Sequence, residues 1–305
     1  MVKYIEPYHW IICNDKSRWL PGVDPTQRET LLSIGAFLQN IEYAANQFGY
    51  NCSYDALATT AQDEKILDIK LAPSSAISNF DIEQIKLRRT VRSHYLSNRI
   101  PEQDVQYITD DNTDSFHFIP NTSKQYNWLN EQTIEANRIQ SYRNAAQEEL
   151  ANWIRFSNKE AEKHLDGLTT AGMEIEGFSG WVVRNFYKKT DVLKKSFSEQ
   201  SIDKVKQQVQ HSGGWLLITS KDNSVISLLE TGKRLQRMLL KIRQKNMAIH
   251  PMTQILEEPA ITSSLIQSTG INDPIQFVLR TGYIKKYPDP VSLRRPVDWF
   301  VHSDI

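Results

Sequence analysis

Residues 222–251 read DNSVISLLETGKRLQRMLLKIRQKNMAIHP, and this stretch decides the predicted fold. Its apolar residues recur at the spacing of one helix face: Leu228, Leu235, Met238, Leu239, Ile242 and Ile249. Asp222 suits the N-cap of a helix, and Pro251 ends the run. A helix of roughly 25 residues is about twice the average length. We therefore expect it to run through the middle of a domain.

The same pattern occurs near the N-terminus, where residues 35–50 read GAFLQNIEYAANQFGY. Three positions align without gaps, pairing Gly35 with Gly232, Leu38 with Leu235 and Gln39 with Gln236. A strand-like run containing Trp precedes each copy, at residues 9–13 and 214–219. This repeat predicts two related halves about a pseudo-twofold axis. The expected halves are 1–78 and 79–305, with a small-residue linker over 72–79 and an insertion around 160–198.

Composition excludes several classes of protein. The 305 residues hold 36 Lys and Arg against 36 Asp and Glu, so no global charge draws the chain to nucleic acid or membranes. The basic residues of the long helix are expected to be solvated: Lys233, Arg234, Arg237, Lys241 and Lys245. No run approaches the ~20 apolar residues of a membrane span. Without a signal-peptide pattern, the predicted location is the cytoplasm, with a processed export signal as the alternative.

Common catalytic motifs are missing from the sequence. There is no phosphate-binding G-x-x-x-x-G-K-[ST], no G-x-G-x-x-G after a strand and no G-x-S-x-G. The seven histidines and two cysteines lack the spacing of metal ligands. We therefore predict no metal site, and no catalytic residue can be named.

A glycine-rich segment follows the helical residues 128–165, which have an expected break near Ser141. Four glycines alternate with large apolar residues: Gly167, Gly172, Gly177, Gly180, Met173, Ile175, Phe178 and Trp181. Such a segment is not expected to form a regular helix or strand. It is either a mobile flap that covers a site or an ordinary long loop.

One cluster has the chemistry of an anion site. Arg88-Arg89-Thr90-Val91-Arg92 places three cations and a hydroxyl within five residues, and Arg294-Arg295 forms a second basic pair. Guanidinium groups bind phosphate through paired hydrogen bonds, and a hydroxyl adds a donor. The alternative is that each cluster is a solvated surface run.

These features together resemble the nitroreductase superfamily of flavoproteins, in its Acg-type single-chain branch. The family's phosphate motif, Arg-x-Ser/Thr-x-Arg/Lys, is matched by Arg88, Thr90 and Arg92. Three further motifs are similar: the turn Pro251-Met252-Thr253-Gln254 after a long helix, the tail Gly282-Tyr283 with Arg294-Arg295-Pro296, and Arg18-x-Leu20-Pro21-x-x-Asp24-Pro25-x-x-Arg28-Glu29.

The resemblance implies an α+β fold with a mostly antiparallel sheet, long central helices and two pseudo-twofold-related halves. It implies FMN as cofactor, NAD(P)H as hydride donor and a small electron acceptor as second substrate. The implied cofactor-binding residues are Arg88, Thr90, Arg92, Pro251, Met252, Thr253, Gln254, Arg294 and Arg295. Arg89 is expected to point elsewhere, since alternate residues of an extended stretch face opposite ways. The chain would be a monomer with an internal pseudo-dimer, or a homodimer.

One family segment, Ser-x-x-Asn-x-Gln-Pro-Trp, has no counterpart before Met1, where it should just have ended. The resemblance implies either a truncated start or a member that has lost half of its polar flavin contacts. Three functions are therefore considered. The first is an FMN-dependent NAD(P)H oxidoreductase. The second is a non-catalytic protein that sequesters FMN beneath a lid, and the third is a degenerate scaffold without a cofactor.

Overall fold

The computed structural model describes residues 1–75, 80–110 and 112–303. The chain is a mixed α+β protein, and most strand pairs of its two larger sheets are antiparallel, as predicted. It packs as two units. Unit 1 contains residues 1–88, 220–240 and 295–305, and unit 2 contains residues 89–219 and 241–294. The predicted halves describe an internal repeat, which this division by packing does not test.

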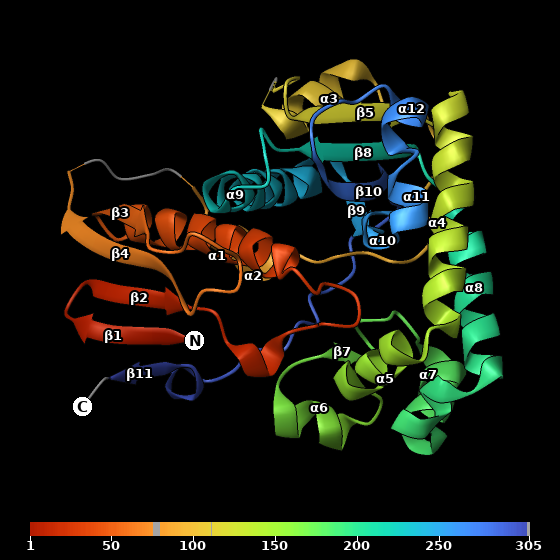
Figure 1. The fold of residues 1–305 in the computed structure, drawn as a ribbon, viewed down its shortest axis with the longest axis horizontal. Helices are drawn as coiled ribbons and strands as arrows, with labels where there is room; N and C mark the ends of the chain where they lie inside the picture. Colours follow the sequence, from red (N-terminus) through yellow and green to blue (C-terminus); the bar gives the residue numbers. More distant parts are fainter. Residues whose placement is uncertain (76–79, 111, 304–305) are drawn as a thin grey trace. The chain divides into compact units, whose positions relative to one another are not determined.

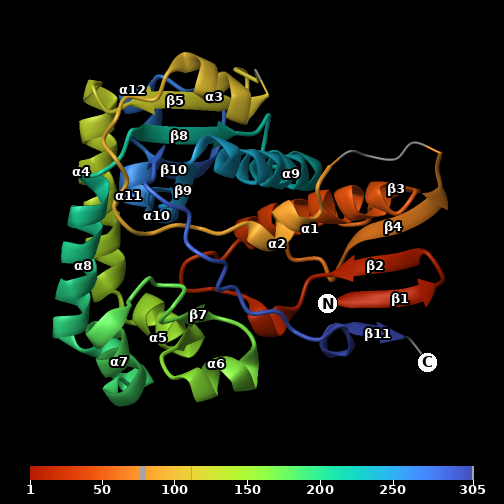
Figure 2. The same ribbon diagram turned by 180° about the vertical axis from the view of Figure 1, so that it is seen from behind.

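Unit 1 is built on a five-stranded sheet in the order β11-β1-β2-β4-β3 (Figure 2). The strands are β1 (Val2–Glu6), β2 (His9–Cys13), β3 (Tyr50–Ala56), β4 (Lys65–Pro73) and β11 (Val301–Ser303). β11 runs parallel to β1, and the other neighbours are antiparallel. The expected linker over 72–79 is wrong at its start, because residues 72 and 73 belong to β4. Its residues 76–79 lie outside the described part of the chain.

The helices of unit 1 include the two copies of the sequence repeat. They are α1 (Arg28–Gln47), α2 (Glu83–Leu87) and α9 (Val225–Lys241, in this unit as far as residue 240), with short 3-10 turns η1 (Lys16–Arg18) and η4 (Val297–Trp299). Both aligned leucines are buried: Leu38 is 0% exposed and Leu235 is 9% exposed. The two aligned positions therefore lie on the buried faces of α1 and α9.

The prediction of one long helix over 222–251 is wrong at both ends. α9 begins at Val225, where the Ser224 hydroxyl accepts a hydrogen bond from the amide of Ser227, and the Asp222 carboxylate in turn binds Ser224. After Lys241 the chain forms a 3-10 turn, η3 (Ile242–Lys245), and Asn246 adopts a left-handed φ of 53°. That conformation ends the helix, and residues 247–251 form a strand instead.

Unit 2 contains a four-stranded antiparallel sheet in the order β5-β8-β10-β9 (Figure 1). Its strands are β5 (Phe116–Pro120), β8 (Gly214–Thr219), β9 (Met247–Pro251) and β10 (Ile275–Tyr283). A second, parallel pair consists of β6 (Ile154–Arg155) and β7 (Leu168–Thr169). All six residues of β8 are buried, as expected for a strand inside a sheet that is covered on both faces.

The described helices of unit 2 are α3 (Glu102–Thr109), α4 (Lys124–Tyr142), α5 (Asn144–Trp153), α6 (Asn158–His164), α7 (Gly177–Phe186), α8 (Lys195–Val209), α10 (Gln254–Glu257), α11 (Pro259–Thr262) and α12 (Leu265–Thr269), with a 3-10 turn η2 (Lys189–Leu193). α4 and α8 pack side by side (Figure 1). The predicted break near Ser141 is confirmed at Arg143, between α4 and α5. The glycine-rich segment was expected to lack regular structure, and this is wrong at two places: Leu168–Thr169 form strand β7, and α7 begins at Gly177.

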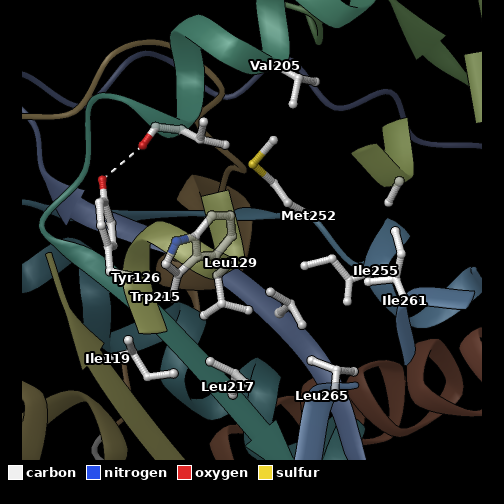
Figure 3. Close-up of a cluster of buried hydrophobic side chains, with 13 residues drawn as sticks. Ile119, Tyr126, Leu129, Val205, Trp215, Leu217, Met252, Ile255, Ile261 and Leu265 are labelled. Carbon is white, nitrogen blue, oxygen red and sulfur yellow. Dashed lines mark hydrogen bonds between the residues drawn. The ribbon is translucent and has the colours of Figure 1, made fainter. Parts of the chain in front are cut away.

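Figure 3 shows the core of unit 2, which forms between the sheet and α4, α8 and α10. Trp215 is 0% exposed, and its indole N–H donates to the side-chain oxygen of Asn130 at 2.9 Å. The Tyr126 hydroxyl donates to the carbonyl oxygen of Val209 at 2.9 Å. These bonds satisfy the polar atoms of two large buried aromatic side chains, so both can remain inside the core.

Candidate functional site

The cation-rich loop of the predicted phosphate motif follows α2, which ends where Arg88 becomes extended. Arg89 and Val91 are buried, whereas Thr90 and Arg92 are half-buried. Val91 packs with Tyr95, Ala248 and Ile284, all within unit 2. The alternation expected of an extended stretch is therefore present.

Arg89, which was expected to point away from the phosphate site, contacts the same segment as Arg92. The guanidinium of Arg89 lies 3.3 Å from Oε1 of Glu174, and the same oxygen accepts the backbone N–H of Arg92 at 3.0 Å. The Arg92 side chain donates to the carbonyl oxygen of Gly172 at 2.9 Å. Both arginines thus contact the glycine-rich segment, and a carboxylate lies between them.

Behind this loop is a buried arginine that the sequence analysis missed. Arg280 of β10 is 0% exposed, and its guanidinium lies 4.1 Å from the ring centre of Tyr95. It donates to the carbonyl oxygens of Gln208, Arg92 and Ser93. Burial lowers the pKa of Arg280, yet an arginine remains a cation at neutral pH. The signal in the sequence is an arginine inside the apolar strand IQFVLRTGY.

His250 faces Arg280 across the β9–β10 ladder and is also buried. Burial lowers the pKa of His250 well below its usual value, and the cations Arg280, Arg92 and Lys204 lower it further. The imidazole is therefore neutral at neutral pH, and its Nδ1 has no hydrogen-bond partner. It adds no charge to the cluster of cations.

A cavity of about 220 Å³ opens beside Arg92. Its lining includes Arg92, His94, Met173, Glu174, Lys204 and Gln208. Lys204 of α8 donates from Nζ to the carbonyl oxygen of Met173 at 3.0 Å. The cavity therefore has two cations and one carboxylate among its lining residues, a polar environment suited to a small charged group.

The predicted turn 251–254 follows strand β9 rather than a helix, which corrects its expected context. Met252 is 1% exposed, its side chain packs in the core, and its amide donates to the carbonyl oxygen of Val278 at 2.9 Å. Gln254 begins α10, and its side-chain oxygen is buried without a hydrogen-bond partner. A buried acceptor without a partner suits contact with a ligand donor.

The remaining predicted residues are divided between the units. Arg88 and Arg295 belong to unit 1, and Arg294 belongs to unit 2, where it is exposed and donates to the carbonyl oxygen of Leu293. Convergence of these side chains on one phosphate stays a prediction. Within the described ranges, no cluster of three or more His, Cys, Asp or Glu side chains is arranged to hold a metal ion. No described helix is long and apolar enough to cross a membrane.

The prediction that the basic residues of the long helix are solvated is wrong for Lys233. This side chain is buried, lies 2.7 Å from the carboxylate of Glu42 and stands 4.8 Å from the ring centre of Tyr54. Arg237 is half-buried and donates to Gln39 at 2.7 Å. These cations stabilise the packing of unit 1.

Comparison with known proteins finds the nitroreductase family among solved structures. No protein-family model matches the chain, and no curated protein matches it. An iodotyrosine deiodinase bound to FMN and 3-iodo-L-tyrosine is 14% identical, with 70% of this chain and 95% of that chain covered and a TM-score of 0.39.

Two further neighbours are named for flavin or nicotinamide chemistry. The FMN-dependent nitroreductase NfnB from Mycobacterium smegmatis, in complex with NADPH, is 15% identical, covers 72% of this chain and 96% of its own, and has a TM-score of 0.41. The NADPH:FMN oxidoreductase from Vibrio harveyi, complexed with NAD+, is 13% identical over 73% and 76% of the chains, with a TM-score of 0.37. These low values transfer no residue-level role to this chain.

Proposed function

We propose that this chain binds FMN and acts as an NAD(P)H-dependent oxidoreductase of nitroreductase type. The observation that carries the proposal is the loop Arg89–Arg92, which gathers guanidinium groups beside a cavity. A phosphate monoester carries nearly two negative charges at neutral pH and accepts hydrogen bonds through three oxygens. Two arginines and a hydroxyl within four residues match those charges and acceptors.

The residues of unit 2 fit one end of FMN. Thr90 and Arg92 would bind the phosphate, and the buried oxygen of Gln254 would accept a hydrogen bond from a polar edge of the cofactor. The cavity of about 220 Å³ is smaller than the ~300–1,000 Å³ of most ligand pockets. It suits the phosphate end and not the whole cofactor. Arg294, also in unit 2, is a further candidate of the predicted set.

FMN, when bound, would supply the means to accept a hydride from NAD(P)H and to pass electrons to a second small substrate. The task of this chain's residues is then to hold the phosphate, orient the ring and exclude water. Arginine serves the first task well because its planar fork remains charged and pre-organised. No residue is assigned to proton transfer.

The test is binding of FMN to the purified chain. We expect reconstituted protein to keep flavin absorbance after gel filtration and to lose that absorbance when NADPH is added without oxygen. Arg92→Ala should weaken FMN by about 1.5–3 kcal/mol, roughly ten- to a hundredfold, since it removes a charge-assisted contact. Riboflavin, which lacks the phosphate, should bind both proteins alike. Arg138→Ala, on the exposed face of α4, is the matched control.

A second candidate function is FMN binding without turnover. It is favoured by the way residues 171–174 bond to Arg89, Arg92 and Lys204, which would restrict access to these cations. In that case the flavin should be retained but should not be reduced by NADH or NADPH. Retention together with rapid reduction contradicts this candidate, and failure to bind FMN contradicts both.

We further propose that the flavin interface lies within a single chain in the cytoplasm. The support is the twofold-like contact of α1 with α9, in which Gly35 meets Leu229 and Gly232 meets Leu32. Sedimentation of the FMN-loaded protein would test this directly. A mass of one chain, with flavin bound, is the expected result, and flavin found with dimers alone would contradict it.

A further inference from the structure

The cations around Arg92 outnumber the carboxylates that face them. Arg89, Arg92 and Lys204 all bond to the segment 171–174, and Arg280 lies directly behind Arg92. Among the described ion pairs, Glu174 is the carboxylate that reaches this group. Arg89 is 6% exposed and Arg280 is 0% exposed, so water screens them poorly. Buried cations of this kind are stabilised by an anion nearby, and one carboxylate leaves the group with an excess of positive charge.

Four consecutive residues of the glycine-rich segment fill the space between these cations. The carbonyl oxygens of Ala171, Gly172 and Met173 accept hydrogen bonds from Arg89, Arg92 and Lys204 respectively. The carboxylate of Glu174 accepts from the amide of Arg92 at 3.0 Å and lies 3.3 Å from the guanidinium of Arg89. The segment therefore presents four oxygen acceptors, as a bound oxyanion would.

The fit of Glu174 is imperfect. Its φ of 57° is a left-handed conformation, which costs a residue other than glycine about 1 kcal/mol or more. Its Oε2 is buried without a hydrogen-bond partner, and so is Nε of Arg89. A carboxylate with one unsatisfied oxygen, beside a guanidinium with one unsatisfied N–H, leaves room for a better acceptor.

Space for such an acceptor is adjacent. The cavity of about 220 Å³ is lined by Arg92, Lys204 and Glu174 itself. It exceeds several times the ~30 Å³ share of one water molecule. An oxyanion in this cavity would contact the same cations that the segment now contacts.

We propose that Arg89, Arg92 and Lys204 form a binding site for a phosphate-class anion, and that Glu174 occupies their hydrogen-bonding groups as an internal competitor. Binding of the anion displaces residues 171–174 from the cations. The inference rests on the proposed function only in that FMN is one carrier of such a phosphate. Free inorganic phosphate has the same chemistry and can be tested without flavin.

The experiment measures inorganic phosphate binding to the full chain by calorimetry at constant ionic strength. Glu174→Gln keeps the side-chain shape and removes the competing charge, so phosphate should bind about tenfold more tightly or better. Glu176→Gln removes an equal charge from an exposed position of the same segment and should leave the affinity within about twofold of wild type. Lys204→Met should weaken phosphate by about tenfold in a well-folded protein, because Lys204 is an exposed residue of α8.

A second measurement follows the segment itself. In the wild-type protein, saturating phosphate should increase hydrogen exchange in peptides that cover residues 169–176, whereas chloride at equal ionic strength should not. Unchanged phosphate affinity in Glu174→Gln, or unchanged exchange with phosphate bound, overturns the proposal. Should Glu174→Gln fail to fold, exchange in the wild type and binding by Lys204→Met decide the matter alone.

The outcomes also separate this inference from the proposed function. If phosphate binds more tightly to Glu174→Gln than to wild type but the protein binds no FMN, the role of Glu174 as competitor is supported and the proposed FMN binding is contradicted. If wild type and Glu174→Gln bind FMN equally tightly, the proposed FMN binding is supported and the role of Glu174 as competitor is contradicted.

Discussion

Gly35 of α1 and Gly232 of α9 occupy reciprocal positions in one helix pair. A Cβ atom on Gly35 would lie 2.1 Å from the carbonyl oxygen of Leu229, and a Cβ on Gly232 would lie 2.0 Å from that of Leu32. The repeat that aligns Gly35 with Gly232 also aligns Leu32 with Leu229. Replacing each residue by its repeat partner therefore turns the first contact into the second. The polar contacts farther along obey the same exchange, since Gln236 binds Asn40 and Arg237 binds Gln39. The repeat seen in the sequence is therefore a twofold-like contact in the structure.

Alanine at either glycine should destabilise the protein. The added methyl group has to push two helix backbones apart, and overpacking of this kind costs about 1–3 kcal/mol, which exceeds the gain in helix propensity. Urea unfolding of Gly35→Ala and Gly232→Ala measures the cost. Ser33→Ala, exposed on the same helix, should change stability by less than about 0.5 kcal/mol. The double variant should lose less stability than the sum of the two single losses, because the first methyl group has already separated the helices. Additive costs would contradict a shared contact.

The two aligned leucines should contribute to the stability of unit 1. Leu38→Ala and Leu235→Ala each remove a buried side chain and leave a cavity, so each should cost about 2–5 kcal/mol. The cost should be larger at Leu38, which is 0% exposed against 9% for Leu235. Phe37→Ala, at an exposed neighbouring position, is the control. A cost below that of the control at either leucine would show that the apolar stripe does not hold the pair together.

Asp63 should make the folded state sensitive to acid. Amide and hydroxyl groups of Thr59 and Thr60 donate to its carboxylate and lower its pKa from 3.8 to about 2. Since the folded pKa lies below the unfolded one, its stabilisation is present above about pH 4 and is lost as the pH falls towards 2. The urea midpoint of Asp63→Asn should therefore fall less than that of wild type between pH 6 and about pH 3. If the urea midpoint changes equally with pH in Asp63→Asn and in the exposed control Asp55→Asn, Asp63 does not cause the acid sensitivity.

Cys52 should react slowly with thiol reagents while the protein is folded. Burial and the nearby Glu42 carboxylate raise the pKa of Cys52 from 9.0 to about 11, so little thiolate is present at neutral pH. In a Cys13→Ala background, labelling at about pH 8 should be about a hundredfold slower in the folded protein than in urea. The same shift predicts that this thiol's contribution to stability is lost as the pH rises from 9.0 to about 11. Equal labelling rates with and without urea would show that the thiol is not buried.

The helix pair was predictable because its signal is local. Leu38 and Leu235 each belong to a set of apolar residues at helical spacing within one helix, and their alignment required no knowledge of packing. The end of α9 was not predictable in this way. Ile242 and Ile249 continue the apolar pattern beyond α9, but the left-handed turn at Asn246 and pairing with β10 place residues 247–251 in a sheet. Tertiary pairing overrode periodicity there.

The candidate site depends on contacts between residues that are distant in sequence. The motif containing Arg92 could be found because its cations are adjacent along the chain. Glu174 could not, since its partner Arg89 is 85 residues away and an isolated glutamate in a glycine-rich segment carries no signal. The burial of Lys233 could not be predicted for the same reason, because its ion-pair partner Glu42 lies 191 residues away. Sequence patterns identify cations more readily than the groups that neutralise them.

The division of the chain between its two units has a consequence for any attempt to separate them. The backbone passes from one unit to the other after Arg88, Thr219, Leu240 and Arg294, so neither unit is a continuous piece of sequence. No single proteolytic cut can release either one intact, and no simple truncation can express it alone. Two of these passages fall inside the basic pairs Arg88-Arg89 and Arg294-Arg295. Trypsin cleavage at those bonds therefore reports directly on whether the connections between the units are accessible.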